Sequence, residues 1–138
     1  LAGEMSGHMF FKDRYLGFDD ALYASCRLLE IMAETGKGVD ELIADLPKTY
    51  TTPEIRVECP DEIKFDVVAK IVAEFKAKQE VIDIDGLRAI YEDGWGLVRA
   101  SNTQPALVLR FEALSEPRLE EIRNEIETAL KKIIEETE

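Results

Sequence analysis

Two Asp-Gly pairs constrain the fold of this chain more than any other feature. Asp85-Gly86 and Asp93-Gly94 separate three short apolar runs, at residues 81–84, 87–92 and 95–100. Asp-Gly is among the strongest short-range signals for a β-hairpin, because glycine accepts the positive φ that a tight turn needs. The region therefore predicts a three-stranded antiparallel meander.

Further strands are predicted on both sides of the meander. Residues 107–113 place Leu107, Leu109, Phe111 and Ala113 at every second position, which indicates a fourth strand of the meander. Residues 54–58 alternate Ile55 and Val57 with charged residues and predict a half-buried strand of their own.

Two helices accompany these strands. The first opens at Pro60-Asp61, and the second is capped by Ser115 with Pro117 in its first turn. The positions that we expect to be buried are Phe65, Val68, Val72 and Phe75 in the first helix and Leu119, Ile122, Ile126, Leu130 and Ile133 in the second. Residues 51–138 thus predict an α+β domain of order β-α-β-β-β-β-α, an antiparallel sheet covered by two helices.

Residues 1–50 predict an incomplete α/β segment. A short apolar run at residues 9–11 reads as a buried strand, and Asp19 or Asp20 caps a helix that ends at Gly36 and Gly38. Apolar side chains cover two neighbouring stripes of this helix, so it needs partners on two sides. A short helix around Leu42, Ile43 and Leu46 is stopped by Pro47, and the polar residues 48–53 are the predicted linker.

Composition excludes several classes of protein. The 138 residues suit one ordinary domain, or a small domain with a piece of another, and the net charge of −12 disfavours nucleic-acid and anionic-membrane partners. No apolar run approaches the roughly 20 residues that span a bilayer, and the N-terminus does not resemble a secretion signal. We therefore expect a cytoplasmic protein with no membrane partner.

Cysteine and histidine content argues against a metal or disulfide framework. Cys26 and Cys59 stand far apart, and His8 is the single histidine. We expect no metal site in this chain and two buried thiols.

The stretch from Arg99 to Pro105 carries the clearest chemistry. It gathers a guanidinium, the hydroxyls of Ser101 and Thr103 and the amide of Asn102 on a turn between two apolar runs. Arginine matches phosphate geometry, and the neutral groups add further donors. The alternative is an ordinary polar turn, in which Arg99 is solvated and Asn102 tolerates a left-handed backbone.

A second loop, Gly-Glu-Met-Ser-Gly-His at residues 3–8, places Glu4, Ser6 and His8 at alternate positions. On an extended backbone all three point to one side. The carboxylate and hydroxyl suit vicinal sugar hydroxyls, and a histidine is able to move a proton near neutral pH. The alternative is a packing or surface histidine beside a glycine turn.

Taken together, these two motifs resemble the C-terminal part of the α-D-phosphohexomutases, specifically the phosphomannomutase/phosphoglucomutase branch. The resemblance runs through essentially all of the chain. It implies that residues 1–50 are the end of domain three, an α/β domain, and that residues 51–138 are domain four, whose fold is TATA-binding-protein-like. Domains one and two of the same protein would be its partners, and because Leu1 is not an initiator residue we expect a fragment of a longer chain.

The resemblance also implies roles for individual residues. Glu4 and Ser6 would bind sugar hydroxyls of mannose or glucose 1- and 6-phosphates, and His8 would lie beside the substrate and assist proton transfer. Arg99, Ser101, Asn102 and Thr103 would hold the phosphate that is not reacting. Arg110, on the fourth strand of the meander, is a weaker candidate.

Two parts of the family pattern have no counterpart in the sequence. These are the phosphoserine loop and the Mg²⁺-binding loop. For the intact enzyme, the resemblance implies Mg²⁺ and hexose 1,6-bisphosphate. For this chain alone, which lacks both loops, it implies no catalytic residue and no mutase activity. A phosphoglucosamine mutase is the nearest alternative, but those enzymes usually carry Gln at the place of Met5 and Ser-Gly-Thr-Glu-Pro at residues 101–105. A stand-alone interaction module is the alternative outside enzymes, and the apolar faces of residues 1–50 suggest self-association.

Overall fold

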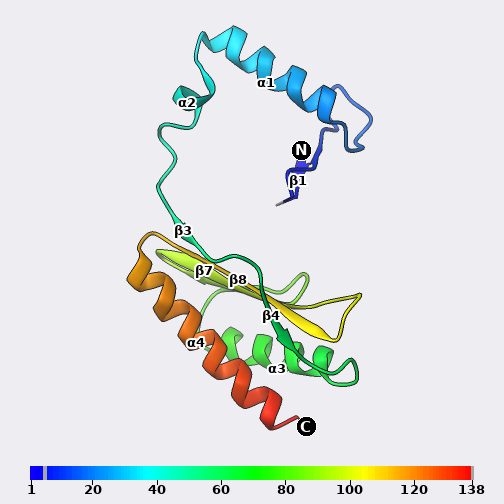
Figure 1. The fold of residues 1–138 in the computed structure, drawn as a ribbon, viewed down its shortest axis with the longest axis vertical. Helices are drawn as coiled ribbons and strands as arrows, with labels where there is room; N and C mark the ends of the chain where they lie inside the picture. The colour runs from blue at the N-terminus through cyan, green and yellow to red at the C-terminus, as the bar shows by residue number, and fades with distance from the viewer. Residues whose placement is uncertain (5, 138) are drawn as a thin grey trace. The chain divides into compact units, whose positions relative to one another are not determined.

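The computed structural model describes residues 1–4 and 6–137, and the contacts within it divide the chain into two compact units (Figure 1). The first unit is Leu1–Leu46 and the second begins at Pro47. The sequence places the boundary at residue 50, within the polar stretch that follows Pro47. Met5, a residue that distinguishes this sequence from the usual phosphoglucosamine mutase motif, lies outside the described residues.

The first unit consists of a short hairpin and two helices. Its elements are β1 (Ala2–Gly3), β2 (Met9–Phe10), α1 (Ala21–Thr35) and α2 (Val39–Leu42). Asp20 caps α1 by accepting the backbone N–H of Tyr23 at 2.9 Å, and Gly36 ends α1 in the left-handed conformation at φ 68°. The sequence predicted both ends of this helix. The short helix ends at Leu42, earlier than the predicted stop at Pro47.

None of the described residues of the first unit is buried. The strand expected to be buried exposes 38% of Met9, and Cys26, expected to be a buried thiol, is exposed. Local order comes from aromatic contacts instead: the rings of Tyr15 and Tyr23 stack with their centroids 3.9 Å apart. The apolar stripes of α1 stay uncovered within this unit, because it supplies no second layer to pack against them.

The second unit confirms the predicted α+β domain. Its elements are β3 (Tyr50–Thr51), β4 (Ile55–Glu58), α3 (Lys64–Lys76), β5 (Val81–Ile82), β6 (Leu87–Tyr91), β7 (Gly94–Ala100), β8 (Ala106–Ala113) and α4 (Glu116–Glu135). The linker prediction is wrong at its end: Tyr50 and Thr51, assigned to the linker, pair with Ala113 and Glu112 of β8 as strand β3. Backbone pairing does not require apolar side chains, so the polar sequence gave no sign of it.

The sheet of this unit is antiparallel, with strand order β3-β8-β7-β6-β5, and β4 also pairs with β8. Both α3 and α4 lie on one face of it (Figure 1). Alternate residues of β8, from Leu107 to Ala113, point into the core between sheet and helices, as the period of two predicted. The result is a two-layer domain whose other sheet face carries no helix.

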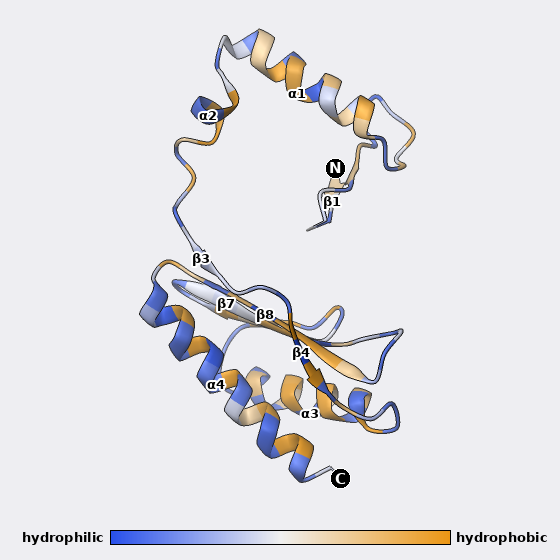
Figure 2. Cartoon of the chain, viewed as in Figure 1, coloured by the Kyte–Doolittle hydropathy of each residue, from blue (hydrophilic) through white to orange (hydrophobic). Residues whose placement is uncertain are grey.

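The residues predicted to be buried agree with the structure in α4 but not in all of α3. In α4 the five predicted positions are the buried ones, and Figure 2 shows its orange and blue faces. In α3 the buried row is Lys64, Val67, Ile71 and Phe75, whereas Phe65 is 58% exposed. Two adjacent apolar rows run along α3, and spacing alone did not say which of them faces the sheet.

The two Asp-Gly turns also differ from each other. Gly86 has φ +100°, as a tight turn requires, and lies between β5 and β6. Gly94 is instead the first residue of β7 and pairs with Tyr91, so the tip of that hairpin is Glu92-Asp93. The meander is as predicted, with its second turn displaced by a residue.

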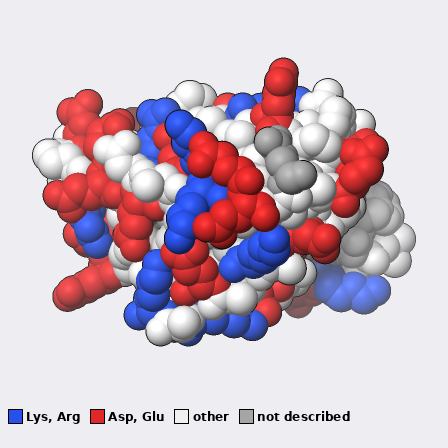
Figure 3. Space-filling view, turned by 90° about the horizontal axis from the view of Figure 1, so that it is seen from below, with Lys and Arg blue, Asp and Glu red and all other residues white. Residues whose placement is uncertain are grey.

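Charged side chains cover the outer side of the helices. Arg123 pairs with Glu127 at 2.8 Å and Arg118 with Glu121 at 2.9 Å along α4. Figure 3 shows blue and red side chains mixed over the face seen from below. Among the described residues, no helix is long and apolar enough to cross a membrane.

Candidate functional site

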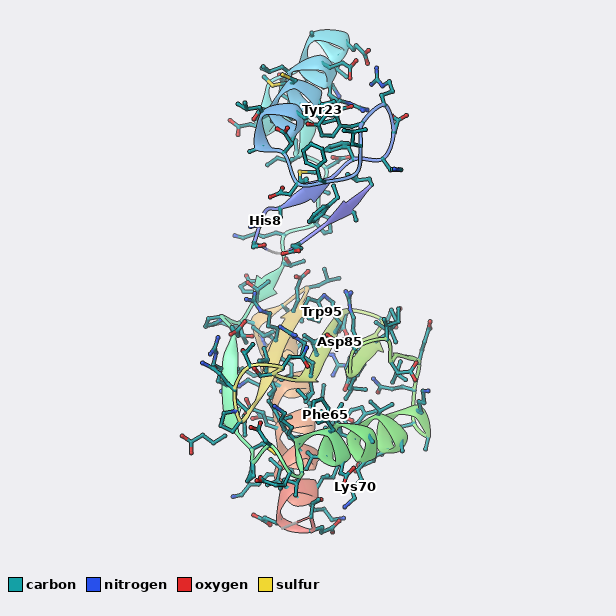
Figure 4. All side chains as sticks on the ribbon, turned by 90° about the vertical axis from the view of Figure 1, so that its right-hand side faces the viewer. His8, Tyr23, Phe65, Lys70, Asp85 and Trp95 are labelled. Carbon is teal, nitrogen blue, oxygen red and sulfur yellow. The ribbon has the colours of Figure 1, made fainter. Side chains whose placement is uncertain are left out.

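The predicted sugar-binding residues lie in the β1–β2 turn of the first unit (Figure 4, where His8 is labelled). The backbone does not run extended as expected: Gly7 has φ +91°, and its N–H donates to the Glu4 carbonyl at 3.0 Å. The turn still brings two of the predicted groups together, because the Ser6 hydroxyl donates to Oε2 of Glu4 at 3.1 Å. A carboxylate and a hydroxyl therefore stand side by side in an exposed turn.

His8 is joined to a residue that the sequence had considered only as a helix cap. Nδ1 of His8 lies 3.1 Å from Oδ2 of Asp19, and Oδ1 of Asp19 accepts the backbone N–H of Met9 at 3.3 Å. Asp20 takes the capping role, which leaves the Asp19 carboxylate available to orient the imidazole. A carboxylate at Nδ1 favours a proton on that nitrogen and leaves Nε2 as the acceptor.

The predicted phosphate-binding residues lie on the β7–β8 turn, residues 101–105, and on the end of β7 before it. Oγ of Ser101 accepts the backbone N–H groups of Thr103 at 3.3 Å and Gln104 at 3.2 Å. Asn102 and Thr103 are exposed on the turn. Among the described non-glycine residues only Arg14 has positive φ, so the left-handed Asn102 of the alternative reading does not occur.

Arg99 stands on β7 beside this turn. Its pairing partner is Val108 of β8, and the guanidinium side chain is 39% exposed. Nη1 of Arg99 lies 3.7 Å from Oδ2 of Asp85. The guanidinium is thus held at the surface by one long ion pair and keeps other N–H donors available.

A second arginine, Arg56, also lies beside Val108 on the sheet. Arg56 of β4 pairs with Val108 from the opposite side of β8, so Arg56 and Arg99 flank the same residue on one sheet face. Arg56 also donates to the side-chain carbonyl of Gln104 in the turn. Sequence reasoning missed Arg56, because it comes 43 positions before Arg99 and only sheet pairing brings the two close.

Glu54 balances part of this positive charge. Oε1 of Glu54 accepts from Arg56 at 2.9 Å, and Arg110, the weaker candidate, lies 3.5 Å from Oε2. The hydrogen bond from Arg56 lowers the pKa of the Glu54 carboxyl below its usual value, and Arg110 contributes a smaller lowering. Arg110 therefore lies on the same sheet face as Arg56 and Arg99, and its guanidinium forms an ion pair with Glu54.

Lys64 is the second residue that sequence reasoning missed. It begins α3, is only 4% exposed, and donates to the backbone carbonyls of Ser101 at 2.6 Å and Gln104 at 3.1 Å. Its third contact is Oδ1 of Asp61 at 2.6 Å. A lysine in register with Val67 and Ile71 on the buried row of α3 is the signal that could have revealed it.

In chemical terms, the β7–β8 turn offers a local concentration of N–H and O–H donors in an acidic chain. The Ser101 hydroxyl oxygen already accepts two amide hydrogens, so its own hydrogen is available to an acceptor outside the protein. Arginine and hydroxyl donors in this arrangement suit a tetrahedral oxyanion. No group of three or more His, Cys, Asp or Glu among the described residues could hold a metal ion.

Comparison with known proteins identifies the family. The model of phosphoglucomutase/phosphomannomutase alpha/beta/alpha domain III matches residues 1–50, and that of the phosphoglucomutase/phosphomannomutase C-terminal domain matches residues 54–129. The chain belongs to the phosphoglucomutase/phosphomannomutase family. The two matched segments meet at the polar stretch that leads into the second unit.

Individual relatives of the phosphoglucomutase/phosphomannomutase family agree with this assignment. The chain is 46% identical over 134 residues to a phosphomannomutase/phosphoglucomutase of Pseudomonas putida, covering 96% of this chain and 29% of that protein. It is 34% identical over 137 residues to a probable phosphoglucosamine mutase of Methanopyrus kandleri, covering 99% of this chain and 30% of that one. The chain thus spans less than a third of the length of these relatives.

A crystal structure of a phosphoglucomutase/phosphomannomutase family protein from Burkholderia thailandensis has the same fold. It superposes with a TM-score of 0.72 at 44% identity, covering 95% of this chain and 28% of that one. At this identity the similarity extends beyond the fold to the family.

Proposed function

We propose that this chain forms the substrate-recognition part of a phosphohexomutase that interconverts hexose 1-phosphates and hexose 6-phosphates of mannose or glucose. The observation that carries the proposal is the β7–β8 turn, where Arg99 stands beside a Ser101 hydroxyl whose hydrogen is available. The relatives' names, phosphomannomutase/phosphoglucomutase among them, support the substrate class.

In the proposed reaction a phosphoserine elsewhere in the intact enzyme gives its phosphoryl group to the sugar phosphate. The resulting hexose 1,6-bisphosphate turns around, and the serine takes back the other phosphoryl group. Arg99, Ser101, Asn102 and Thr103 bind the phosphate that is not reacting, and they serve either end of the sugar because all are generic oxyanion donors. Positioning and charge stabilisation of this kind are the main contributions that a protein makes to phosphoryl transfer.

The β1–β2 turn takes the sugar in this proposal. The Glu4 carboxylate accepts hydrogen bonds from sugar hydroxyls, and Ser6 both donates and accepts. His8, oriented by Asp19, accepts a proton at Nε2. Magnesium would serve the intact enzyme, and the described residues of this chain offer no group of three ligands for it.

The proposal is tested by substrate binding to the 138-residue chain. Glucose 1-phosphate titrated into the ¹⁵N-labelled chain should shift the amide signals of residues 99–104. Arg99→Ala should weaken binding by about 1.5–3 kcal/mol, the net value of a charge-assisted hydrogen bond, which is roughly 10- to 150-fold. Arg123→Ala, which removes an arginine from the outer side of α4, is the control and should leave binding unchanged. Equal binding by the Arg99 variant would contradict the proposal.

The chain alone should not catalyse the reaction. The sequence has no counterpart of the family's phosphoserine loop, so nothing in it can donate a phosphoryl group. We expect no conversion of glucose 1-phosphate to glucose 6-phosphate by the purified chain, measured by phosphorus NMR over several hours. Conversion that survives repeated purification would show that the chain has a phosphoryl donor of its own.

A further inference from the structure

We propose that Lys64 is a positioning residue for phosphate recognition: its buried ammonium fixes the β7–β8 turn in the shape that binds the anion. The inference rests on the proposed function, because it assigns a role within the same site. It concerns a residue that touches only the backbone of the turn. Lys64 therefore acts through Ser101 and its neighbours rather than on the substrate.

Lys64 is buried, so its ammonium depends on the acceptors that the protein supplies. The residue is 4% exposed, and an ammonium removed from water is costly unless each of its three N–H groups has an acceptor. Three acceptors surround Nζ: the carbonyl oxygens of Ser101 and Gln104 and Oδ1 of Asp61. Only one of these is a charged group, and the other two belong to the turn.

The two carbonyls lie near opposite ends of the turn. Ser101 is its first residue and Gln104 is next to its last, and one nitrogen atom binds both within 3.1 Å. With both carbonyls directed inward at Nζ, the peptide planes at both ends are fixed. The residues between them, Asn102 and Thr103, are exposed.

Other contacts of the turn depend on this shape. The Ser101 hydroxyl oxygen accepts the N–H groups of Thr103 and Gln104, and the N–H of Ser101 donates to Ala106 at 2.9 Å. If the ends of the turn separate, Ser101 Oγ loses these partners and its hydrogen no longer has one preferred direction. Preorganisation of this kind raises affinity because fewer conformations are lost on binding.

The first test needs no mutation. A ¹⁵N-selective NMR spectrum of the lysine ammonium groups should show the Lys64 NH₃⁺ signal in slow exchange with water. Couplings across its hydrogen bonds should connect it to the carbonyl carbons of Ser101 and Gln104. Absence of both couplings would overturn the proposal, whatever the variants do.

The second test replaces the ammonium. Lys64→Met keeps the length and apolar stem of the side chain, and we expect about tenfold weaker binding of glucose 1-phosphate together with faster hydrogen exchange at the amides of Ser101 and Ala106. Amides of β6 should keep their protection, which shows that the domain is still folded. Lys70→Met on the same helix removes a lysine whose ammonium donates to the Thr137 hydroxyl at 2.9 Å, away from the β7–β8 turn. It is the matched control and should leave binding unchanged.

These outcomes separate the two proposals. If the folded Lys64→Met chain binds glucose 1-phosphate as well as the unmodified chain does, the role of Lys64 is overturned and the proposed function stands. If the unmodified chain shows the ammonium couplings but no amide shifts at residues 99–104 with glucose 1-phosphate, the proposed function fails, and the role of Lys64 in phosphate recognition fails with it.

Discussion

Nη1 of Arg99 lies 3.7 Å from Oδ2 of Asp85, which stands on the turn between β5 and β6 (labelled in Figure 4). The Asp85 side chain is 73% exposed, so water and salt screen this pair. In the proposed function a phosphate binds at the same guanidinium. Asp85 is then both a support for Arg99 and a like charge close to the bound phosphate.

Asp85→Asn should strengthen glucose 1-phosphate binding. The change removes a negative charge that competes for Arg99, and an exposed pair of this kind is worth about 0.2–1 kcal/mol, which corresponds to an increase of up to roughly fivefold. The gain should shrink as salt is added. Asp83→Asn, two positions earlier, changes the chain by the same charge but releases Lys76 instead and is the control. Weaker binding by the Asp85 variant would mean that support for Arg99 outweighs competition.

Gly86→Ala should destabilise the second unit and disturb Arg99. Gly86 has φ +100°, and a Cβ there would stand 2.4 Å from the carbonyl oxygen of Val98 and 3.0 Å from Cα of Arg99. We expect a loss of about 1–3 kcal/mol in the free energy of unfolding, measured by urea titration, because both the backbone conformation and the space exclude a side chain. Gly38→Ala, whose added Cβ would have only ordinary contact at 3.7 Å, should have little effect. Equal stabilities of the Gly86 variant and the unmodified chain would show that β7 moves aside freely.

Glu54 should make stability depend on pH in the acid range. Arg56, and then Arg110, lower the pKa of Glu54 from its ordinary value of 4.5, so the folded state favours the carboxylate. A lowered pKa contributes stability that is present above about pH 4.5 and is lost as the pH falls through the folded-state value. The difference in stability between the unmodified chain and Glu54→Gln should therefore close on acidification. In Arg56→Gln the Glu54 carboxyl carbon should titrate at higher pH by NMR, and an unchanged midpoint would assign the shift to another cause.

Residues 47–138 should fold without the first unit. Every buried apolar residue among those described lies in the second unit, where both helices pack on the sheet. We expect the truncated chain to melt at the same temperature as the 138-residue chain, followed by circular dichroism. A drop of more than about 4 °C, equivalent to roughly 1 kcal/mol for a domain of this size, would mean that the first unit contributes to stability.

Self-association of the chain should depend on α1. Leu22 is 81% exposed and Leu29 61% exposed, and both belong to the apolar stripe that the sequence expects to be covered. We expect the light-scattering mass of the 138-residue chain to rise with concentration. The shortened chain from residue 47 should remain a monomer over the same range, and equal behaviour of the two would exclude α1 as the contact.

Regular patterns predicted the fold of the second unit well, for a physical reason. Residues 107–113 and the buried row of α4 each have one apolar face, so a period of two or of 3.6 decides which side is buried. In α3 two apolar rows compete, and the choice between Phe65 and Val67 depends on the shape of the sheet opposite. Tyr50 and Thr51 join the sheet through backbone pairing, which leaves no mark on hydropathy.

The residues of the candidate site were predictable only where they are local in sequence. Glu4 and Ser6 do contact each other, and Ser101 organises the turn that it begins, because both arrangements span a few residues. Lys64 and Arg56 come to the same turn from α3 and β4, and their contacts with Ser101 and Gln104 depend on the folded sheet. A search for charged residues on otherwise buried helix positions would have found Lys64.

The contact between Lys64 and Ser101 has a consequence for engineering. The ammonium, its acceptors and the arginines around them all belong to the second unit, so that unit could be exchanged between relatives with its anion-recognising turn already shaped. Grafting the turn sequence alone onto another hairpin would take the Lys64 donor from the Ser101 carbonyl and would leave the Gln104 carbonyl with the N–H of Ala106 alone. Such a graft would carry the motif but not the preorganisation.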